Sequence, residues 1–155
     1  MTLLKMRKVL PLISLIFVVG CASVEFPAYI QDKHPYTQRF YGEHKEVLEA
    51  VTNSLKDFGW QIEGTADPVV YEQARAAEPG SENILLFSQV RQSPRILWTT
   101  YSRLNVFISS KNKVSDVEIR YTKIKPLPIK QFKGFRNDNL SKEIFQHITD
   151  YLNQS

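Results

Sequence analysis

Residues 96–125, ILWTTYSRLNVFISSKNKVSDVEIRYTKIK, decide the fold because they read as two long strands joined by a turn at 111–113. In the first strand one set of alternate positions is mostly apolar and includes Trp98, Leu104, Val106 and Ile108. The other set includes Tyr101, Arg103 and Asn105. In the second strand the apolar set is Val117, Ile119 and Tyr121, and the charged set is Asp116, Glu118 and Arg120. Such alternation is typical of antiparallel strands with one buried face and one wet face. The stretch therefore predicts a long hairpin whose charged side faces water.

Two segments outside the hairpin have the periodicity of amphipathic helices. Residues 43–58 form one apolar stripe, which consists of Val47, Leu48, Val51, Leu55 and Phe58. Glu43 and Glu46 suit the first turn of this helix, and Gly59 suits the left-handed position after it. A last helix is predicted at 140–152, with an apolar face of Leu140, Ile144, Ile148, Tyr151 and Leu152.

Shorter segments complete the predicted fold. Strands are expected at 38–41, 60–63 and 83–90, and residues 126–136, with their two prolines and one glycine, are expected to form a loop. Asp67-Pro68 favours a short helix over 69–77, with an extended segment at 69–71 as the alternative. This order predicts an α+β domain with an antiparallel sheet of about four to five strands and two main helices packed on one face.

The first 21 residues have the composition of a secretory signal. Lys5, Arg7 and Lys8 precede an apolar run at 9–19, and Gly20 and Cys21 follow it. The run is shorter than the roughly 20 apolar residues of a membrane span. A buried core helix or an ordinary secretory signal with a chance cysteine are the alternatives.

Val18-Val19-Gly20-Cys21 resembles a bacterial lipobox. The resemblance implies cleavage between Gly20 and Cys21, and lipidation of Cys21 with acyl chains of the palmitate type. Because Ala22 follows the cysteine, the resemblance also implies sorting to the periplasmic side of the outer membrane rather than retention at the outer face of the cytoplasmic membrane. The predicted organisation is a signal peptide at 1–20, a lipidated cysteine with a flexible tether at 21–37, and a single periplasmic α+β domain at 38–155.

The element order, taken with the lipobox, is loosely similar to the helix-grip domains of BamC-type envelope lipoproteins. The residues FYGEHKEVLEAV at 40–51 and GW at 59–60 also resemble the openings of many small bacterial lipoproteins. Neither resemblance transfers a functional residue to this chain. Together they imply a membrane-anchored protein of the cell envelope.

Charge is distributed unevenly along the chain. Residues 21–90 hold 5 basic and 11 acidic residues, whereas residues 91–136 hold 11 basic and 2 acidic residues. One interpretation is a surface for an anionic partner, and the other is that the acidic first half folds against the basic second half. The sequence leaves both open.

No sequence motif indicates catalysis. The three histidines, at 34, 44 and 147, lack metal-ligand spacing, and the one cysteine is assigned to the lipid, so neither a metal nor a cofactor is expected. The chain has no nucleophile elbow, P-loop or dinucleotide-binding glycine motif. We therefore expect a protein that is not an enzyme.

The segment KQFKGFR at 130–136 interleaves cations with aromatic rings, and it is the candidate partner-binding site. Its residues are Lys130, Phe132, Lys133, Phe135 and Arg136. In the envelope such a segment suits an anionic lipid, lipopolysaccharide, a glycan or an acidic protein rather than nucleic acid; alternatively, the two phenylalanines anchor a loop to the sheet. The predicted function is a lipid-anchored, non-catalytic envelope interaction or assembly module, with a binding module for an anionic envelope ligand as the alternative.

Overall fold

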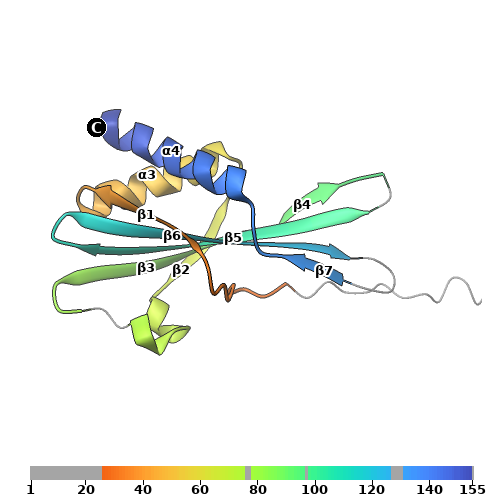
Figure 1. Cartoon of the computed structure of the whole chain (residues 1–155), viewed down its shortest axis with the longest axis horizontal. Coiled ribbons are helices and arrows are strands. Elements are labelled where there is room, and N and C mark those ends of the chain that lie inside the picture. The colour runs from red at the N-terminus through yellow and green to blue at the C-terminus, as the bar shows by residue number, and fades with distance from the viewer. Residues whose placement is uncertain (1–25, 76–77, 97, 127–130, 155) are drawn as a thin grey trace, which may run out of the picture.

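The computed structural model describes residues 26–75, 78–96, 98–126 and 131–154 (Figure 1). Within these residues the chain forms an α+β domain with one antiparallel sheet and two α-helices. The strands are β1 Tyr36–Tyr41, β2 Ile62–Ala66, β3 Ser81–Ser88, β4 Arg91–Pro94, β5 Thr99–Lys111, β6 Val114–Pro126 and β7 Gln131–Gly134. The helices are α3 His44–Asp57 and α4 Asp138–Gln154, and two 3-10 turns are η1 Pro68–Val70 and η2 Gln73–Arg75.

The β5–β6 hairpin is the centre of the sheet, which confirms the predicted hairpin, although its first strand begins at Thr99 rather than at Ile96. The strand order is β1-β6-β5-β3-β2, with β4 added to β5 and β7 added to β6. The hairpin turns through Asn112 and Lys113, whose φ angles are 52° and 64°. Two successive residues of positive φ produce the turn whose twist matches that of the flanking strands. The hairpin register therefore pairs Lys111 with Val114.

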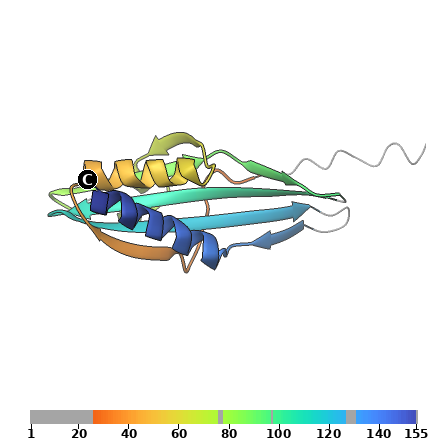
Figure 2. The same cartoon turned by 90° about the horizontal axis from the view of Figure 1, so that it is seen from above.

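Both helices pack on the same face of the sheet, as predicted (Figures 1 and 2). Helix α3 is held at its start by Glu46, which accepts a hydrogen bond from the Glu43 backbone N–H at 2.9 Å. It ends before Gly59, whose φ of 75° few other residues adopt without strain. The apolar parities of β5 and β6 are buried beneath α3 and α4, and the buried set includes Val47, Leu55, Val106, Ile119, Ile144 and Ile148.

The sheet differs from the predicted one in its number of strands. Seven strands are described instead of four or five, because RQSP at 91–94 and QFKG at 131–134 pair with β5 and β6 as short outer strands. The segment expected to be a loop over 126–136 therefore contains β7. Neither short strand alternates in hydrophobicity, so neither has the pattern of a half-buried strand.

The predicted helix over 69–77 is replaced by the two short 3-10 turns in the part described. Asp67 does cap the first of them, because its carboxylate accepts a hydrogen bond from the Val69 N–H at 3.0 Å. Each of these 3-10 turns spans three residues, and no α-helix is assigned in this segment. The strand expected at 60–63 starts two residues later, as β2.

The largest correction concerns the face of the sheet opposite the helices. Arg103, Asn105, Glu118 and Arg120 were expected to face water, yet all four are buried. They are covered by residues 26–35, which we call the N-terminal segment, and by η1 and η2 (Figure 1). Ile30 in this segment is only 1% exposed. A cover made from irregular backbone has no periodicity by which the sequence could reveal it.

The prediction of a flexible tether at 21–37 therefore fails for residues 26–37. The N-terminal segment packs on the sheet, and β1 begins at Tyr36. The folded domain thus includes residues from 26 onward rather than from 38. Residues 1–25, with the predicted signal peptide, Gly20 and Cys21, lie outside the described residues.

Candidate functional site

The β5–β6 hairpin extends beyond the ends of the two helices, and its helix-side face is uncovered there (Figure 1). A groove of about 380 Å³ lies on this uncovered face. It is lined by Ser93, Arg95, Trp98, Thr100, Ser102, Tyr121, Lys123 and Lys125. We call this part of the molecule, made of β4, β7 and residues 95–96, 98–102 and 121–125, the cationic end.

Strand alternation explains why the groove has these residues. Side chains at every second position share a face, so Thr100 and Ser102 continue the row that holds Leu104. On β6, Lys123 continues the row that holds Tyr121, and the ladder places Lys123 opposite Ser102. The same face is therefore apolar beneath the helices and turns hydroxylic and cationic beyond them.

An aromatic ring and a cation form one wall of the groove. The ammonium group of Lys125 lies 3.8 Å from the centre of the Trp98 ring. Trp98 is 36% exposed, although its position alternates in step with the buried core residues of β5. The backbone N–H of Arg95 donates to the Trp98 carbonyl at 2.8 Å and closes the β4–β5 turn. This turn brings Arg95 to the groove beside the Trp98–Lys125 pair.

The groove floor is a buried cluster of hydroxyl groups. Thr100, Ser102 and Tyr121 are all buried. Burial raises the pKa of Tyr121 above its usual range, and hydrogen bonds with Ser102 and Asn137 only partly offset that effect. The Tyr121 hydroxyl is therefore neutral, and the charge of the groove comes from its rim.

Eight of the eleven cations in residues 91–136 fall into two groups, according to whether they form an ion pair. Arg103, Lys111, Lys113 and Arg120 pair with Glu63, Glu78, Glu43 and Glu72, all of which lie in the acidic first half. This confirms the pairing of the two halves for these four residues. Within the described residues, Arg95, Lys123, Lys125 and Lys133 make no ion pair.

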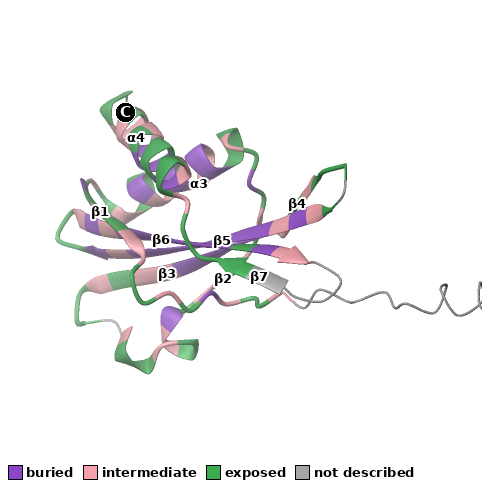
Figure 3. Cartoon of the chain, turned by 45° about the vertical axis from the view of Figure 1, so that its right-hand side comes forward, coloured by how far each residue is buried: buried purple, intermediate pink, exposed green. Residues whose placement is uncertain are grey.

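The surroundings of the second group explain why they are unpaired. Residues 91–115 and 119–137 contain no acidic residue, and these segments include the whole cationic end. Figure 3 shows the second half of β7 and the residues just after it as exposed, in contrast to the buried centre of β5 and β6. The positive charge of this end is thus left for solvent or for a partner.

The five residues predicted to bind a partner are only partly together. Lys130 lies outside the described residues, and Phe132 pairs with Lys125 through the backbone of β7. Lys133 and Phe135 are exposed. Arg136 is bound to Asp138 at 3.2 Å and lies 4.9 Å from the centre of the Tyr36 ring, so its charge is already paired.

Sequence reasoning missed the groove residues Arg95, Trp98, Lys123 and Lys125. The signal available was the absence of acidic residues on both sides of the hairpin, together with the length of its strands. A hairpin longer than the helices that cover it must leave one end of its face uncovered. The strand pairing of β4 and β7 then brings 91–95 and 131–134 to the same end.

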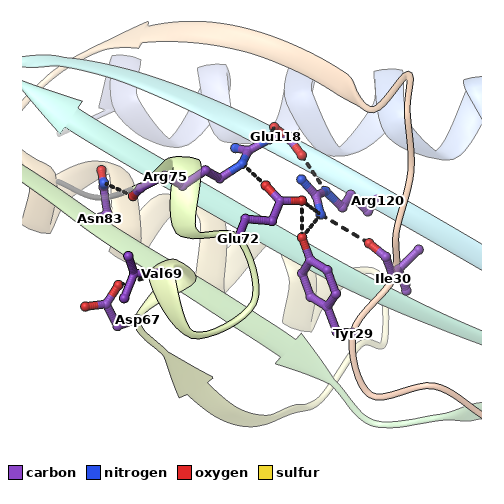
Figure 4. Close-up of polar contacts among 9 residues, drawn as sticks. All are labelled: Tyr29, Ile30, Asp67, Val69, Glu72, Arg75, Asn83, Glu118 and Arg120. Carbon is purple, nitrogen blue, oxygen red and sulfur yellow. Dashed lines mark hydrogen bonds and ion pairs between the residues drawn. The ribbon is translucent and has the colours of Figure 1, made fainter.

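On the opposite face, Arg120 is the centre of a buried ion-pair network (Figure 4). It donates hydrogen bonds to Glu72 at 2.9 Å and to the Ile30 carbonyl at 3.2 Å. It also donates to Glu118 and to the Tyr29 hydroxyl. The Arg120 side chain is only 3% exposed. These contacts join the N-terminal segment and the 3-10 turns to β6.

A second set of contacts extends the same cover. Arg75 donates to Glu118 at 2.8 Å. Asn105 accepts a hydrogen bond from the Ile30 N–H at 2.7 Å and donates to the Ala28 carbonyl at 3.2 Å. Arg103 donates to the Pro27 carbonyl at 3.0 Å. The buried charges of this face are therefore satisfied, as buried ions must be for the fold to be stable.

The network sets the ionisation of its members. Burial opposes the charge of Glu72, but hydrogen bonds from Arg120 and Tyr29 and the positive charges nearby outweigh it and hold the pKa of Glu72 at about 2. Burial raises the pKa of Tyr29, and its hydrogen bond to Glu72 adds to that effect. Glu72 is therefore an anion and Tyr29 a neutral donor, which suits a structural clamp.

One further cluster has residue types that occur in catalytic sites. His44 Nδ1 lies 2.8 Å from the Ser110 hydroxyl, which lies 2.7 Å from the Ser115 hydroxyl. Glu82 lies 3.8 Å from His44 Nε2 and is largely exposed. Ser110 is 6% exposed and its hydroxyl bonds two neighbours, so it is a packed polar contact rather than a nucleophile open to substrate.

No protein-family model and no curated protein matches the chain. In the described part of the chain, no helix is long and apolar enough to cross a membrane. Among the same residues, no three acidic, histidine or cysteine side chains come together in a way that could hold a metal ion.

Proposed function

We propose that this chain is a lipid-anchored lipoprotein of the cell envelope that acts as a non-catalytic interaction or assembly module. Its lipid is attached to Cys21 after cleavage beyond Gly20, and the domain lies on the periplasmic side of the outer membrane. The composition of residues 1–21 supports the anchor. The unpaired cations at the cationic end support the interaction.

The clustering of Arg95, Lys123, Lys125 and Lys133 is the observation on which the interaction depends. Four cations without ion pairs at one end of a small domain attract an anionic partner and raise its rate of encounter. Elsewhere on the described hairpin, Arg103, Lys111, Lys113 and Arg120 are neutralised within the chain. The cationic end is thus where charge complementarity to another molecule is available.

The second candidate function is a binding module for an anionic envelope ligand such as a lipid, lipopolysaccharide or a glycan. Exposed apolar groups beside the cations favour it over a purely protein partner. Ile96 is fully exposed at the β4–β5 turn, and Trp98 and Phe135 are also exposed. Apolar tips flanked by cations suit amphipathic ligands, because both parts of such a ligand find a complementary group.

Metabolic labelling with palmitate tests the anchor. The wild-type chain is expected to incorporate label and to stay in the membrane fraction at high salt, whereas Cys21→Ser loses the label. Incorporation of label into Cys21→Ser would contradict the anchor.

Crosslinking in intact cells, followed by purification from membranes, tests the interaction. The wild-type protein is compared with a triple variant in which Arg95, Lys123 and Lys125 are changed to Glu. A matched control reverses three cations that are exposed elsewhere, at Lys33, Lys45 and Lys56. Loss of crosslinked protein or bound lipid only in the first variant supports the proposal; equal yields from both reject it.

A further inference from the structure

We propose that the cationic end rests on the anionic phospholipid surface to which the chain is anchored. This inference rests on the lipid anchor of the proposed function and names the partner of the cationic end. Three observations support it, and they concern the path of the N-terminal segment, the length of chain before it, and the chemistry of the cationic end.

The N-terminal segment enters the domain from the cationic end. Its first contacts are with Arg103, which lies 6.0 Å over the Phe26 ring and donates to the Pro27 carbonyl. Its later contacts, from Ala28 to Ile30, are with Asn105, farther along β5. In the β5–β6 ladder, Arg103 is one position from Ser102 and its partner Lys123. In Figure 1 the start of this segment lies toward the same side of the molecule as β4 and β7.

The chain before the domain is short. Five residue steps separate Cys21 from Phe26, and an extended chain covers at most 3.3–3.6 Å per residue, so the two are about 18 Å apart at most. The buried contacts of Ile30 and Arg120 prevent the N-terminal segment from unwinding to lengthen this connection. A lipid on Cys21 would therefore hold the start of the domain, and with it the cationic end, close to the membrane.

The cationic end has the chemistry of a membrane-contacting surface. Six large apolar or aromatic residues are exposed in the described part of the chain, and three of them, Ile96, Trp98 and Phe135, are at or beside this end. Tryptophan is favoured at the boundary between lipid and water, and lysine and arginine beside it attract anionic headgroups. The unpaired Arg95 and Lys125 flank Ile96 and Trp98.

The opposite end of the hairpin lacks this chemistry. There Lys111 and Lys113 pair with Glu78 and Glu43, and Glu82 adds a further negative charge. Tyr41 is the exposed aromatic residue of that end. The two ends of one hairpin thus differ in charge and in apolar exposure, and only one of them suits an anionic surface.

The test uses the full-length lipidated protein purified from membranes and reconstituted in vesicles of phosphatidylethanolamine and phosphatidylglycerol. Lipidation blocks Cys21, so a cysteine introduced by Ile96→Cys or, as the matched control, Tyr41→Cys is the single free thiol. Each is labelled with a polarity-sensitive fluorophore. We expect a blue shift, and quenching by brominated lipid, at position 96 and neither at position 41.

The expected signal at position 96 depends on charge. It should be lost in vesicles of phosphatidylcholine alone, and after Lys123 and Lys125 are both changed to Glu, while the protein still floats with the vesicles. A second measurement avoids the new cysteine: brominated lipid should quench Trp98 in the otherwise unchanged protein, and the quenching should disappear in Trp98→Phe, because Trp60 is buried.

Two outcomes would overturn the inference. Equal exposure of positions 96 and 41 to water in floating protein would show that the cationic end faces away from the lipid. Shielding of position 96 from water in native membranes but not in pure lipid would show that the cationic end contacts a protein instead of lipid. A protein that fails to float at high salt, with Cys21 open to thiol labelling, would instead reject the anchor of the proposed function.

Discussion

Strand β6 holds two cations three residues apart, Arg120 and Lys123, whose surroundings are opposite in burial and in charge pairing. Arg120 points to the face covered by the N-terminal segment, where it is 2% exposed and bound to Glu72 and Glu118. Lys123 points to the groove, where it is exposed and makes no ion pair among the described residues. A buried cation without partners would cost several kcal/mol, whereas an exposed one costs little. On β6 the paired cation thus lies where the chain folds on itself, and the unpaired one lies where another molecule can reach it.

Removal of the Arg120 charge should have the largest effect on stability. Arg120→Met leaves Glu72 and Glu118 with Arg75 as their remaining cation beneath the N-terminal segment. Breaking a buried pair in this way costs about 3–5 kcal/mol. Urea unfolding of residues 22–155 measures the loss. Lys123→Met is the matched control on the same strand and should change the free energy of unfolding by less than about 0.5 kcal/mol. Similar values for the two variants would remove the distinction between the two groups of cations.

Ile30 tests whether the N-terminal segment is part of the fold or a tether. Ile30→Ala removes a side chain that is 1% exposed, and such changes cost about 2–5 kcal/mol. Lys33→Ala, in the same segment but exposed, should have no measurable effect. Thermal melting of both variants gives the comparison. If Ile30→Ala melts like the wild type, the segment does not contribute to the stability of the domain.

The two regions also differ in how far the sequence predicts them. Helix α3 and the β5–β6 hairpin were predicted because their periodicity is local, as in Val47, Val51 and Leu55. The cover over Arg120 was not, because Arg120 contacts Tyr29 and Ile30 across about ninety residues of sequence. Alternation shows which side chains share a face, but whether a second layer covers that face depends on segments far away in the chain.

The candidate site was predicted in part for the same reason. The excess of positive charge in 91–136 was visible, and so was the aromatic-cationic segment at 130–136. The sequence did not show which of these cations are already neutralised, because pairs such as Lys111 with Glu78 depend on the tertiary fold. In the structure Arg136 is bound to Asp138. The candidate binding cations are therefore Arg95, Lys123 and Lys125, which line the groove.

Low pH should reduce the stability that Glu72 contributes beneath the N-terminal segment. The pKa of Glu72 is about 2 in the folded protein and near 4.5 when the chain is unfolded. A depressed carboxylate pKa gives stability that is fully present above the unfolded value and is lost as pH falls from 4.5 toward 2. Since the Glu72 side chain is 30% exposed, we expect a loss of about 2 kcal/mol rather than the full shift.

Glu72→Gln is the control for this pH dependence. It removes the carboxylate, so the part of the acid sensitivity that belongs to Glu72 should disappear, and the variant should start from a lower stability at pH 7. The measurement is the urea midpoint between pH 6 and pH 2.5. An unchanged slope in Glu72→Gln would assign the acid sensitivity to other carboxylates.

The smallest effects on stability are expected in the groove, where they test whether its cations differ from Arg120. Lys125→Met removes the cation that lies 3.8 Å from the centre of the Trp98 ring, and exposed contacts of this kind contribute about 0.5–1 kcal/mol. Lys125→Arg keeps the charge over the ring and should restore that stability, which a calorimetric melt can resolve. A loss larger than about 2 kcal/mol would show that Lys125 is part of the fold, as Arg120 is. A near-zero loss of stability, combined with weaker binding to anionic vesicles, would show that the Lys125 charge serves binding rather than folding. Within the described residues no acidic group neutralises this charge.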